Sequence, residues 1–191
     1  MEEKGSPTVL SVDFVNTRYA FRGRPRDSIA TPAELLGWLR SRPDISGPVG
    51  PAPDLPDDVD PEEMATFRAL RDAIGGLFRA AAQHSVGAPA DVAQLNRTAR
   101  MAPSTPVLVT RDGGYATVEH SGETGLAAAL GAIARDAVHL LGGGSYGDLH
   151  ACHGPGCVLL FVTTDARRVW CSPACGNRAR AARHYRRHRG D

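Results

Sequence analysis

Apolar residues recur at spacings of three and four along two long stretches of the chain, as is typical of helices with one buried face. The first stretch follows Asp60, and the second covers residues 123–141. Asp60 and Glu63 match the capping box that begins many helices, and Pro61 suits the first helical position. We therefore expect two core-facing helices, of which the first should fray near residues 84–87.

Shorter helices are expected nearby. Thr31 and Glu34 form a second capping box, so residues 31–42 should be helical, and residues 90–100 predict another short helix. Residues 43–58 contain five prolines, which predicts a linker-like loop.

Two stretches have the composition of β-strands. Residues 8–17 are short and rich in β-branched and aromatic residues, which predicts a strand that ends in a polar turn. Residues 107–118 alternate around Asp112 and Gly113, which predicts a hairpin. Residues 1–143 should therefore form an α+β domain that is mostly helical with a small antiparallel sheet, ended by the glycines that follow Leu141.

The end of the expected strand over residues 8–17 carries the polar residues Asp13, Asn16 and Thr17. One interpretation is local turn hydrogen bonding, which these residue types commonly provide. The other is one wall of a pocket that binds a small-molecule ligand. The residues alone leave both open.

All four cysteines of the chain lie in its last quarter, as two close pairs separated by thirteen residues. They are Cys152, Cys157, Cys171 and Cys175. Two such pairs can place four sulfurs around one ion at about 2.3 Å, and four thiolates favour Zn²⁺ in a structural site with no open position. A redox dithiol and an iron–sulfur centre are the alternatives. His150 and His153 could serve as ligands, but four cysteines already complete the coordination.

We expect residues 144–191 to form a treble-clef-like zinc finger. Residues 158–162 and 168–170 predict a hairpin between the two cysteine pairs. Ser172 should then cap a helix that places Cys175 in its first turn, where the helix dipole favours a thiolate.

Charge is distributed unevenly along the chain, although the net charge is only +1. Residues 1–166 carry 14 basic and 20 acidic residues, whereas residues 167–191 carry 8 and 1. A solvated helix is the plain interpretation, but the adjacent metal module favours a surface that binds a polyanion. Residues expected to contact nucleic acid are Arg167, Arg168, Asn177, Arg178, Arg180, Arg183, Arg186 and Arg187. The opposite side of this helix, with Ala174, Ala181 and Tyr185, is expected to pack against the hairpin and Trp170.

Other classes of protein fit the sequence poorly. No run approaches the roughly eighteen apolar residues of a membrane span, and the first residues lack the pattern of a signal peptide. A cytoplasmic location is therefore expected, where four cysteines favour metal binding over disulfides. No nucleophile–base pair or phosphate-binding loop is apparent, and His84, His120 and His139 are isolated. We do not expect an enzyme.

The motif CSPACGNR at residues 171–178 resembles the CGNR zinc-finger family. VDFVNT at 12–17 and TPAEL at 31–35 resemble the ABATE domain, which accompanies this finger in bacterial proteins described as stress-responsive transcription regulators. The resemblance implies a DNA-binding finger joined to a domain that senses a small molecule. The departures from the family pattern, which leave the cysteines in place, are Thr163, Pro173 and Arg180, where Asp, Met and Lys are usual.

These observations predict a transcription regulator that binds double-stranded DNA through a structural zinc finger. Its N-terminal domain is expected to sense a ligand or to form a homodimer. The alternative is a zinc module that binds RNA or protein without sequence-specific DNA recognition. Few aromatic residues accompany the arginines, which argues against base stacking on single strands.

Overall fold

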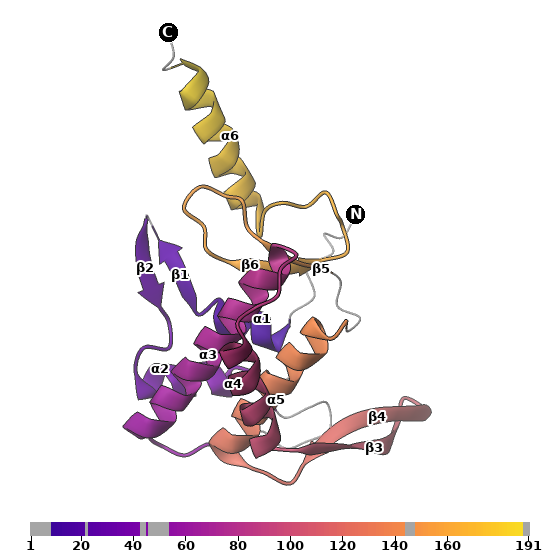
Figure 1. Cartoon of the computed structure of the whole chain (residues 1–191). Coiled ribbons are helices and arrows are strands. Elements are labelled where there is room, and N and C mark those ends of the chain that lie inside the picture. Colours follow the sequence, from indigo (N-terminus) through magenta and orange to yellow (C-terminus); the bar gives the residue numbers. More distant parts are fainter. Residues whose placement is uncertain (1–8, 22, 43–44, 46–53, 144–147, 189–191) are drawn as a thin grey trace.

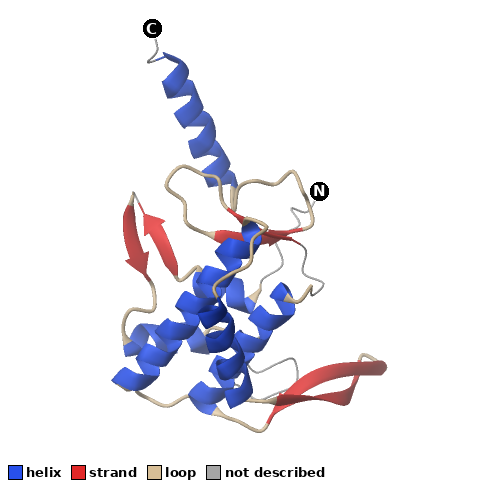
Figure 2. Ribbon diagram, viewed as in Figure 1, coloured by secondary structure: helices blue, strands red, loops and turns tan. Residues whose placement is uncertain are grey.

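The computed structural model describes residues 9–21, 23–42, 45, 54–143 and 148–188. Within these residues the chain forms a helical body, from which paired strands and one long helix extend (Figures 1 and 2). The helices are α1 (Leu10–Val15), α2 (Pro32–Arg40), α3 (Pro61–Ala82), α4 (Pro89–Met101), α5 (Gly125–Leu141) and α6 (Pro173–His188). The strands are β1 (Arg18–Phe21), β2 (Arg24–Asp27), β3 (Ser104–Arg111), β4 (Gly114–Ser121), β5 (Asp148–Ala151) and β6 (Leu160–Thr163). They pair consecutively into three antiparallel two-stranded sheets, which confirms the predicted α+β class.

The four predicted helices of the body are present as α2 to α5. Both capping boxes form: the Thr31 side chain accepts a hydrogen bond from the Glu34 amide, and Asp60 accepts one from the Glu63 amide. In each case the glutamate returns a bond to the backbone amide of the capping residue, so two otherwise unpaired donors are satisfied. Most of the proline-rich loop expected over residues 43–58 lies outside the described residues.

The strand predicted over residues 8–17 is wrong, because Leu10–Val15 form helix α1. A short apolar run is compatible with either a buried strand or a buried helix, and its periodicity cannot distinguish them. Here α3 and α5 pack against α1, so Leu10, Val12, Phe14 and Val15 are all buried. The surroundings of the segment, and not its β-propensity, determine its conformation.

The core of the body lies where α1, α2, α3 and α5 meet. The fully buried Phe14 ring sits at its centre, 5.4 Å from the Trp38 ring and 6.3 Å from the Phe67 ring. Burying a side chain of this size contributes roughly 1.5–3 kcal/mol. Burial of apolar area therefore stabilises the body.

The predicted hairpin around Asp112 and Gly113 is present and is longer than expected. Arg111 of β3 pairs with Gly114 of β4, and Asp112 and Gly113 have φ angles of 50° and 77°. Two successive positive φ angles are typical of the tight turns whose twist matches paired strands. The hairpin extends away from the helical body (Figure 1).

The hairpin β5–β6 packs directly on the helical body. Leu160 and Val162 of β6 belong to the body core, whereas Phe161 points to the other side, into the cysteine cluster. Alternate residues of a strand face opposite sides, so one short strand is shared by two clusters. The predicted domain boundary between residues 143 and 144 adjoins residues 144–147, which lie outside the described residues.

The predicted pairing of residues 158–162 with 168–170 is wrong. The partner of β6 is β5, which precedes the first cysteine pair. The segment from Cys152 to Cys157 therefore reverses the chain between the two strands, and β5 already occupies the pairing edge. Of residues 168–170, Val169 accepts a bond from the His153 amide at 3.0 Å, and the Arg168 amide donates to the nearby Asp165 carbonyl at 3.0 Å, so neither bond pairs this segment with β6.

Candidate metal centre and nucleic-acid interface

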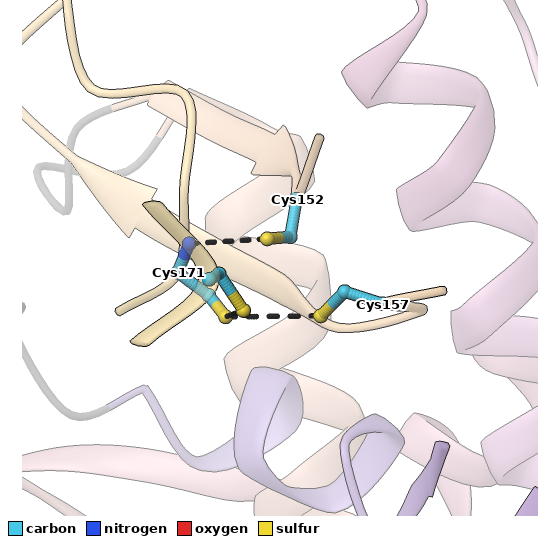
Figure 3. Close-up of side chains that lie close together, drawn as sticks. Cys152, Cys157 and Cys171 are labelled. Atoms are coloured by element: carbon cyan, nitrogen blue, oxygen red, sulfur yellow. Dashed lines mark hydrogen bonds between the residues drawn. The ribbon is translucent and has the colours of Figure 1, made fainter. Parts of the chain in front are cut away.

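The four cysteine sulfurs converge on one point. All four Sγ atoms lie within 4.8 Å of one another, with 3.8 Å between Cys157 and Cys171 and 3.4 Å between Cys171 and Cys175. An ion bound tetrahedrally by sulfurs at 2.3 Å sets neighbouring sulfurs about 3.8 Å apart. Figure 3 shows the side chains of Cys152, Cys157 and Cys171 turned toward one another. Donor type, donor number and spacing all fit a tetrahedral thiolate-bound metal ion.

The first cysteine pair is held by a tight turn after β5. The Cys157 amide donates to the Gly154 carbonyl at 3.0 Å, which closes the turn. A Cβ atom on Gly154 would lie 2.9 Å from the Cys175 Cβ, closer than carbon atoms tolerate. Residue 154 must therefore be glycine for the two cysteine pairs to approach each other.

The second pair is held by the start of α6, as the sequence predicted. The Ser172 hydroxyl accepts a hydrogen bond from the Cys175 amide at 3.3 Å and so caps the helix. Gly176, the next residue, packs against Trp170, and a Cβ atom there would lie 3.1 Å from the indole ring. The first turn of α6 is thus fixed on one side by sulfur and on the other by an aromatic ring.

Hydrogen bonds to sulfur complete the centre. The amides of Gly154 and Cys171 donate to Cys152 Sγ at 3.4 and 3.3 Å. Arg178 Nη2 donates to Cys175 Sγ at 3.0 Å, which places a positive charge against a ligand sulfur. Such donors stabilise thiolates, and four thiolates around a divalent ion carry excess negative charge that Arg178 partly offsets.

The ionisation of the thiols depends on their surroundings. Burial raises the pKa of the Cys157 and Cys171 thiols, so without a cation they favour the protonated form. Burial also acts to raise the pKa of Cys175, but hydrogen bonds from Ser172 and the neighbouring thiols outweigh it and lower the pKa. A bound cation would supply the charge that lets all four sulfurs ionise.

An exposed basic surface follows along α6. Arg180, Arg183, His184 and Arg187 line an open depression on the helix, and Arg186 is also exposed. Pro173–His188 contains five arginines and no acidic residue.

Other residues expected to contact nucleic acid have partners within the finger. Arg168 donates to the carbonyls of Trp170 and Cys171 at 3.1 and 2.7 Å and covers the Phe161 ring at 5.0 Å. Asn177 accepts a hydrogen bond from Arg180, and Arg178 contacts sulfur. Arg167 is almost fully exposed beside Asp165. The assignment of these residues to a nucleic-acid surface stays a prediction.

The expectation that Ala174, Ala181 and Tyr185 pack against the hairpin and Trp170 is wrong. All three residues are exposed, Tyr185 by 71%, and the buried residues of α6 are Cys175 and Gly176. The finger is too small to cover more than the first part of a 16-residue helix, which is about 24 Å long at 1.5 Å per residue. Helix α6 consequently projects from the molecule (Figure 1).

Asp13, Asn16 and Thr17 bind three different parts of the chain. Asp13 forms an ion pair with Arg42 at 2.7 Å. The Asn16 amide makes two bonds to Leu160 of β6, donating to its carbonyl at 2.8 Å and accepting from its amide at 2.9 Å. The Thr17 hydroxyl donates to the Phe14 carbonyl at 2.6 Å. Asn16 therefore joins the body to the finger, and the ligand pocket stays a prediction.

Sequence reasoning missed an ion pair between the buried Arg71 of α3 and the partly buried Asp27 of β2. Arg71 of α3 is 1% exposed and binds both carboxylate oxygens of Asp27, at 2.7 and 2.5 Å, and the Thr17 hydroxyl at 2.8 Å. Burial acts to raise the pKa of Asp27, but Arg71 outweighs it and holds that pKa below its usual value. A signal was available, since Arg71 lies between Leu70 and Ile74 in the apolar stripe of α3, where a charge needs a partner.

A four-cysteine metal centre that fixes the start of a basic helix defines this chain as a zinc-finger protein. Residues 149–188 match the CGNR zinc finger, and residues 8–144 match the ABATE family, described as "Putative stress-induced transcription regulator". The chain belongs to the ABATE family and carries a C-terminal CGNR zinc finger, as the resemblance implied. A search of curated proteins gives no significant match. None of the described helices combines the length and the apolar character needed to cross a lipid bilayer.

Proposed function

We propose that this protein is a transcription regulator that binds double-stranded DNA through α6, with Zn²⁺ as the structural ion of its finger. One observation carries the proposal: α6 projects from the metal centre with exposed arginines and no acidic residue. When bound, the ion supplies four bonds that hold the first knuckle against the start of α6. Cys152, Cys157, Cys171 and Cys175 would hold it.

The spacing of the arginines supports a duplex as the partner. Arg180, Arg183 and Arg187 follow one another at intervals of three and four residues, so they lie along one face of the helix. Guanidinium groups bind phosphate through two parallel hydrogen bonds and can also contact guanine edges. A single helix of this diameter fits the major groove of duplex DNA.

The helical body would act as the regulatory part, by binding a small ligand or by forming a homodimer. The two hydrogen bonds between Asn16 and Leu160 support this role, because a change in the body would reach the finger through them. We further propose that the protein binds and does not catalyse, and that it acts in the cytoplasm, where its four cysteines stay reduced and able to bind the ion.

The test is duplex binding by the full-length, zinc-loaded protein. Selection from random duplexes should enrich one sequence, and affinity for it should fall steeply with salt. Replacing Arg180, Arg183 and Arg187 with alanine removes three phosphate contacts. The slope of log affinity against log salt concentration should become about 2.7 less steep, and the affinity in 0.15 M salt should fall by about 100-fold.

The matched control changes the same charge elsewhere. Arg97, Arg100 and Arg111 are exposed on α4 and β3, and their replacement with alanine should leave affinity within about twofold. An equal loss of duplex affinity in the two triple variants, or preferential binding of RNA over duplex DNA in competition, would overturn the proposal.

A further inference from the structure

The hairpin β1–β2 carries a second basic surface. In its antiparallel register Tyr19 pairs with Arg26, and Phe21 pairs with Arg24. Directly paired residues, and residues two apart on one strand, share a face of the sheet. Two arginines and two aromatic rings therefore occupy the same face, and all four are exposed.

The opposite face of this hairpin is anchored to the body. It carries Asp27, which binds the buried Arg71, and Arg18, which forms an ion pair with Asp72. Both partners belong to α3. The face with Arg24 and Arg26 is consequently turned away from α3, toward solvent. We call the β1–β2 hairpin the arm, and its end with Arg18 and Asp27 the root; the contacts of the root with α3 limit how far the arm can move.

The same root is connected to the zinc finger. Strand β1 begins two residues after Asn16, whose side chain holds Leu160 of β6. Thr17, between them, binds Arg71. The hairpin and the finger thus share one base on the body, and in Figure 1 the hairpin extends toward the end of the molecule from which α6 projects.

The charge of this arm contrasts with that of its surroundings. Residues 1–166 carry 14 basic and 20 acidic residues, so a polyanion near the body meets net repulsion. In the described part of the chain, Arg24 and Arg26 have no carboxylate within ion-pair distance, unlike Arg18 at the root. Two guanidinium groups with free hydrogen-bond donors suit the phosphates of a nucleic acid backbone.

We infer that the β1–β2 hairpin is a second DNA-binding element, whose Arg24 and Arg26 bind backbone phosphates of the duplex beside the stretch contacted by α6. This inference rests on the proposed function. It assigns to the body a direct part in DNA binding, with the finger and the arm contacting one duplex from a shared base.

The experiment compares duplex binding by the zinc-loaded wild type, an Arg24→Ala/Arg26→Ala variant and an Arg97→Ala/Arg100→Ala control. Loss of two phosphate contacts should lower the log–log salt slope by about 1.8 and the affinity in 0.15 M salt by about 30-fold. Hydroxyl-radical footprinting of the arm variant should lose protection on one flank and keep that of α6. An Arg24→Lys/Arg26→Lys variant, which keeps both charges, should keep most of the salt slope.

The outcomes separate the two proposals. If the wild type does not bind duplex DNA, or if the α6 triple variant binds it as tightly as the wild type, the proposed function and the inference are both overturned. If the α6 triple variant binds the duplex more weakly, but the arm variant matches the control in salt slope and footprint, the inference alone is overturned. An Arg24→Gln/Arg26→Gln variant controls for distortion of the hairpin by alanine. If both variants change the salt slope equally, the loss of the two charges is the cause; if only the alanine variant changes it, the inference is overturned.

Discussion

The helical body and the zinc finger are stabilised in opposite ways. Phe14, Phe67 and the apolar faces of four helices bury a continuous core in the body. In the finger the cluster of buried residues is limited to Cys152, Phe161 and Cys175, with partly buried neighbours around it. An apolar core of that size cannot offset the entropy of ordering its segment, so the metal bonds must supply the difference. The body should therefore depend on packing and the finger on its ion.

The strongest test of this contrast removes one metal ligand. Cys175→Ala should abolish binding of about one zinc ion per chain, whose binding free energy in such sites is roughly 10–16 kcal/mol. Affinity for duplex DNA should fall at least as far as in the α6 triple variant, whereas thermal unfolding of the body should shift little. Elemental analysis measures the zinc content, a duplex titration measures the affinity, and calorimetry measures the unfolding of the body.

A matched control for this ligand variant is His153→Ala. His153 follows a cysteine ligand but is exposed, so its loss should leave the zinc content unchanged. Full zinc content in Cys175→Ala, or collapse of the body when zinc is removed, would contradict the separate origins of stability.

The next effect in size concerns the body. Arg71→Ala removes the bidentate partner of Asp27 and leaves Arg18 at 3.7 Å and the Ile29 amide, which costs about 3 kcal/mol, the lower end of the range for a broken buried pair, because Asp27 is 26% exposed. Calorimetry should show a lower unfolding temperature with unchanged zinc content, the reverse of the ligand variant. Arg68→Ala, on the same helix, removes one exposed hydrogen bond to the Ala30 carbonyl and should cost about 1 kcal/mol or less.

The pH dependence of unfolding checks the same ion pair. The folded-state pKa of Asp27 is lowered, so its contribution is present at pH values above the unfolded pKa of about 3.9 and is lost as the pH falls below it. The difference in unfolding free energy between wild type and Asp27→Asn should therefore be largest near neutral pH and shrink in acid. A difference independent of pH between 7 and 3 would show that the pair is not the cause.

The smallest effect lies where the two regions meet. Asn16→Ala removes two hydrogen bonds to Leu160, which costs about 2 kcal/mol, and should speed amide exchange at Leu160 more than in the centre of α3. Asn16→Asp keeps the acceptor and loses the donor, so it should show a partial effect. Unchanged exchange at Leu160 in both variants would mean that Asn16 does not join body and finger.

The features that the sequence predicted depend on local chemistry. The capping boxes at Thr31 and Asp60 act within four residues, and the cysteine spacing needs only tight turns to bring sulfurs together. The basic helix and its serine cap are local in the same sense. Such features survive in any tertiary context, so pattern reasoning identifies them.

The features that the sequence did not predict depend on distant partners. The segment Leu10–Val15 is helical because α3 and α5 surround it, and β6 pairs with β5 because the first knuckle reverses the chain. Tyr185 stays exposed because the finger ends before it. The pairing of Arg71 with Asp27 spans 44 residues, and a single sequence shows the charge but not its partner.

The shared strand β6 bears on how the protein can be divided for study. A fragment cut to residues 149–188, the span that matches the zinc finger, would carry Leu160 and Val162 without the helices that cover them. The face of β6 that carries these two residues would then be an exposed hydrophobic patch, even with the metal ion bound. Recombinant versions of the finger would stay soluble only with the apolar surface replaced or with its helical support retained.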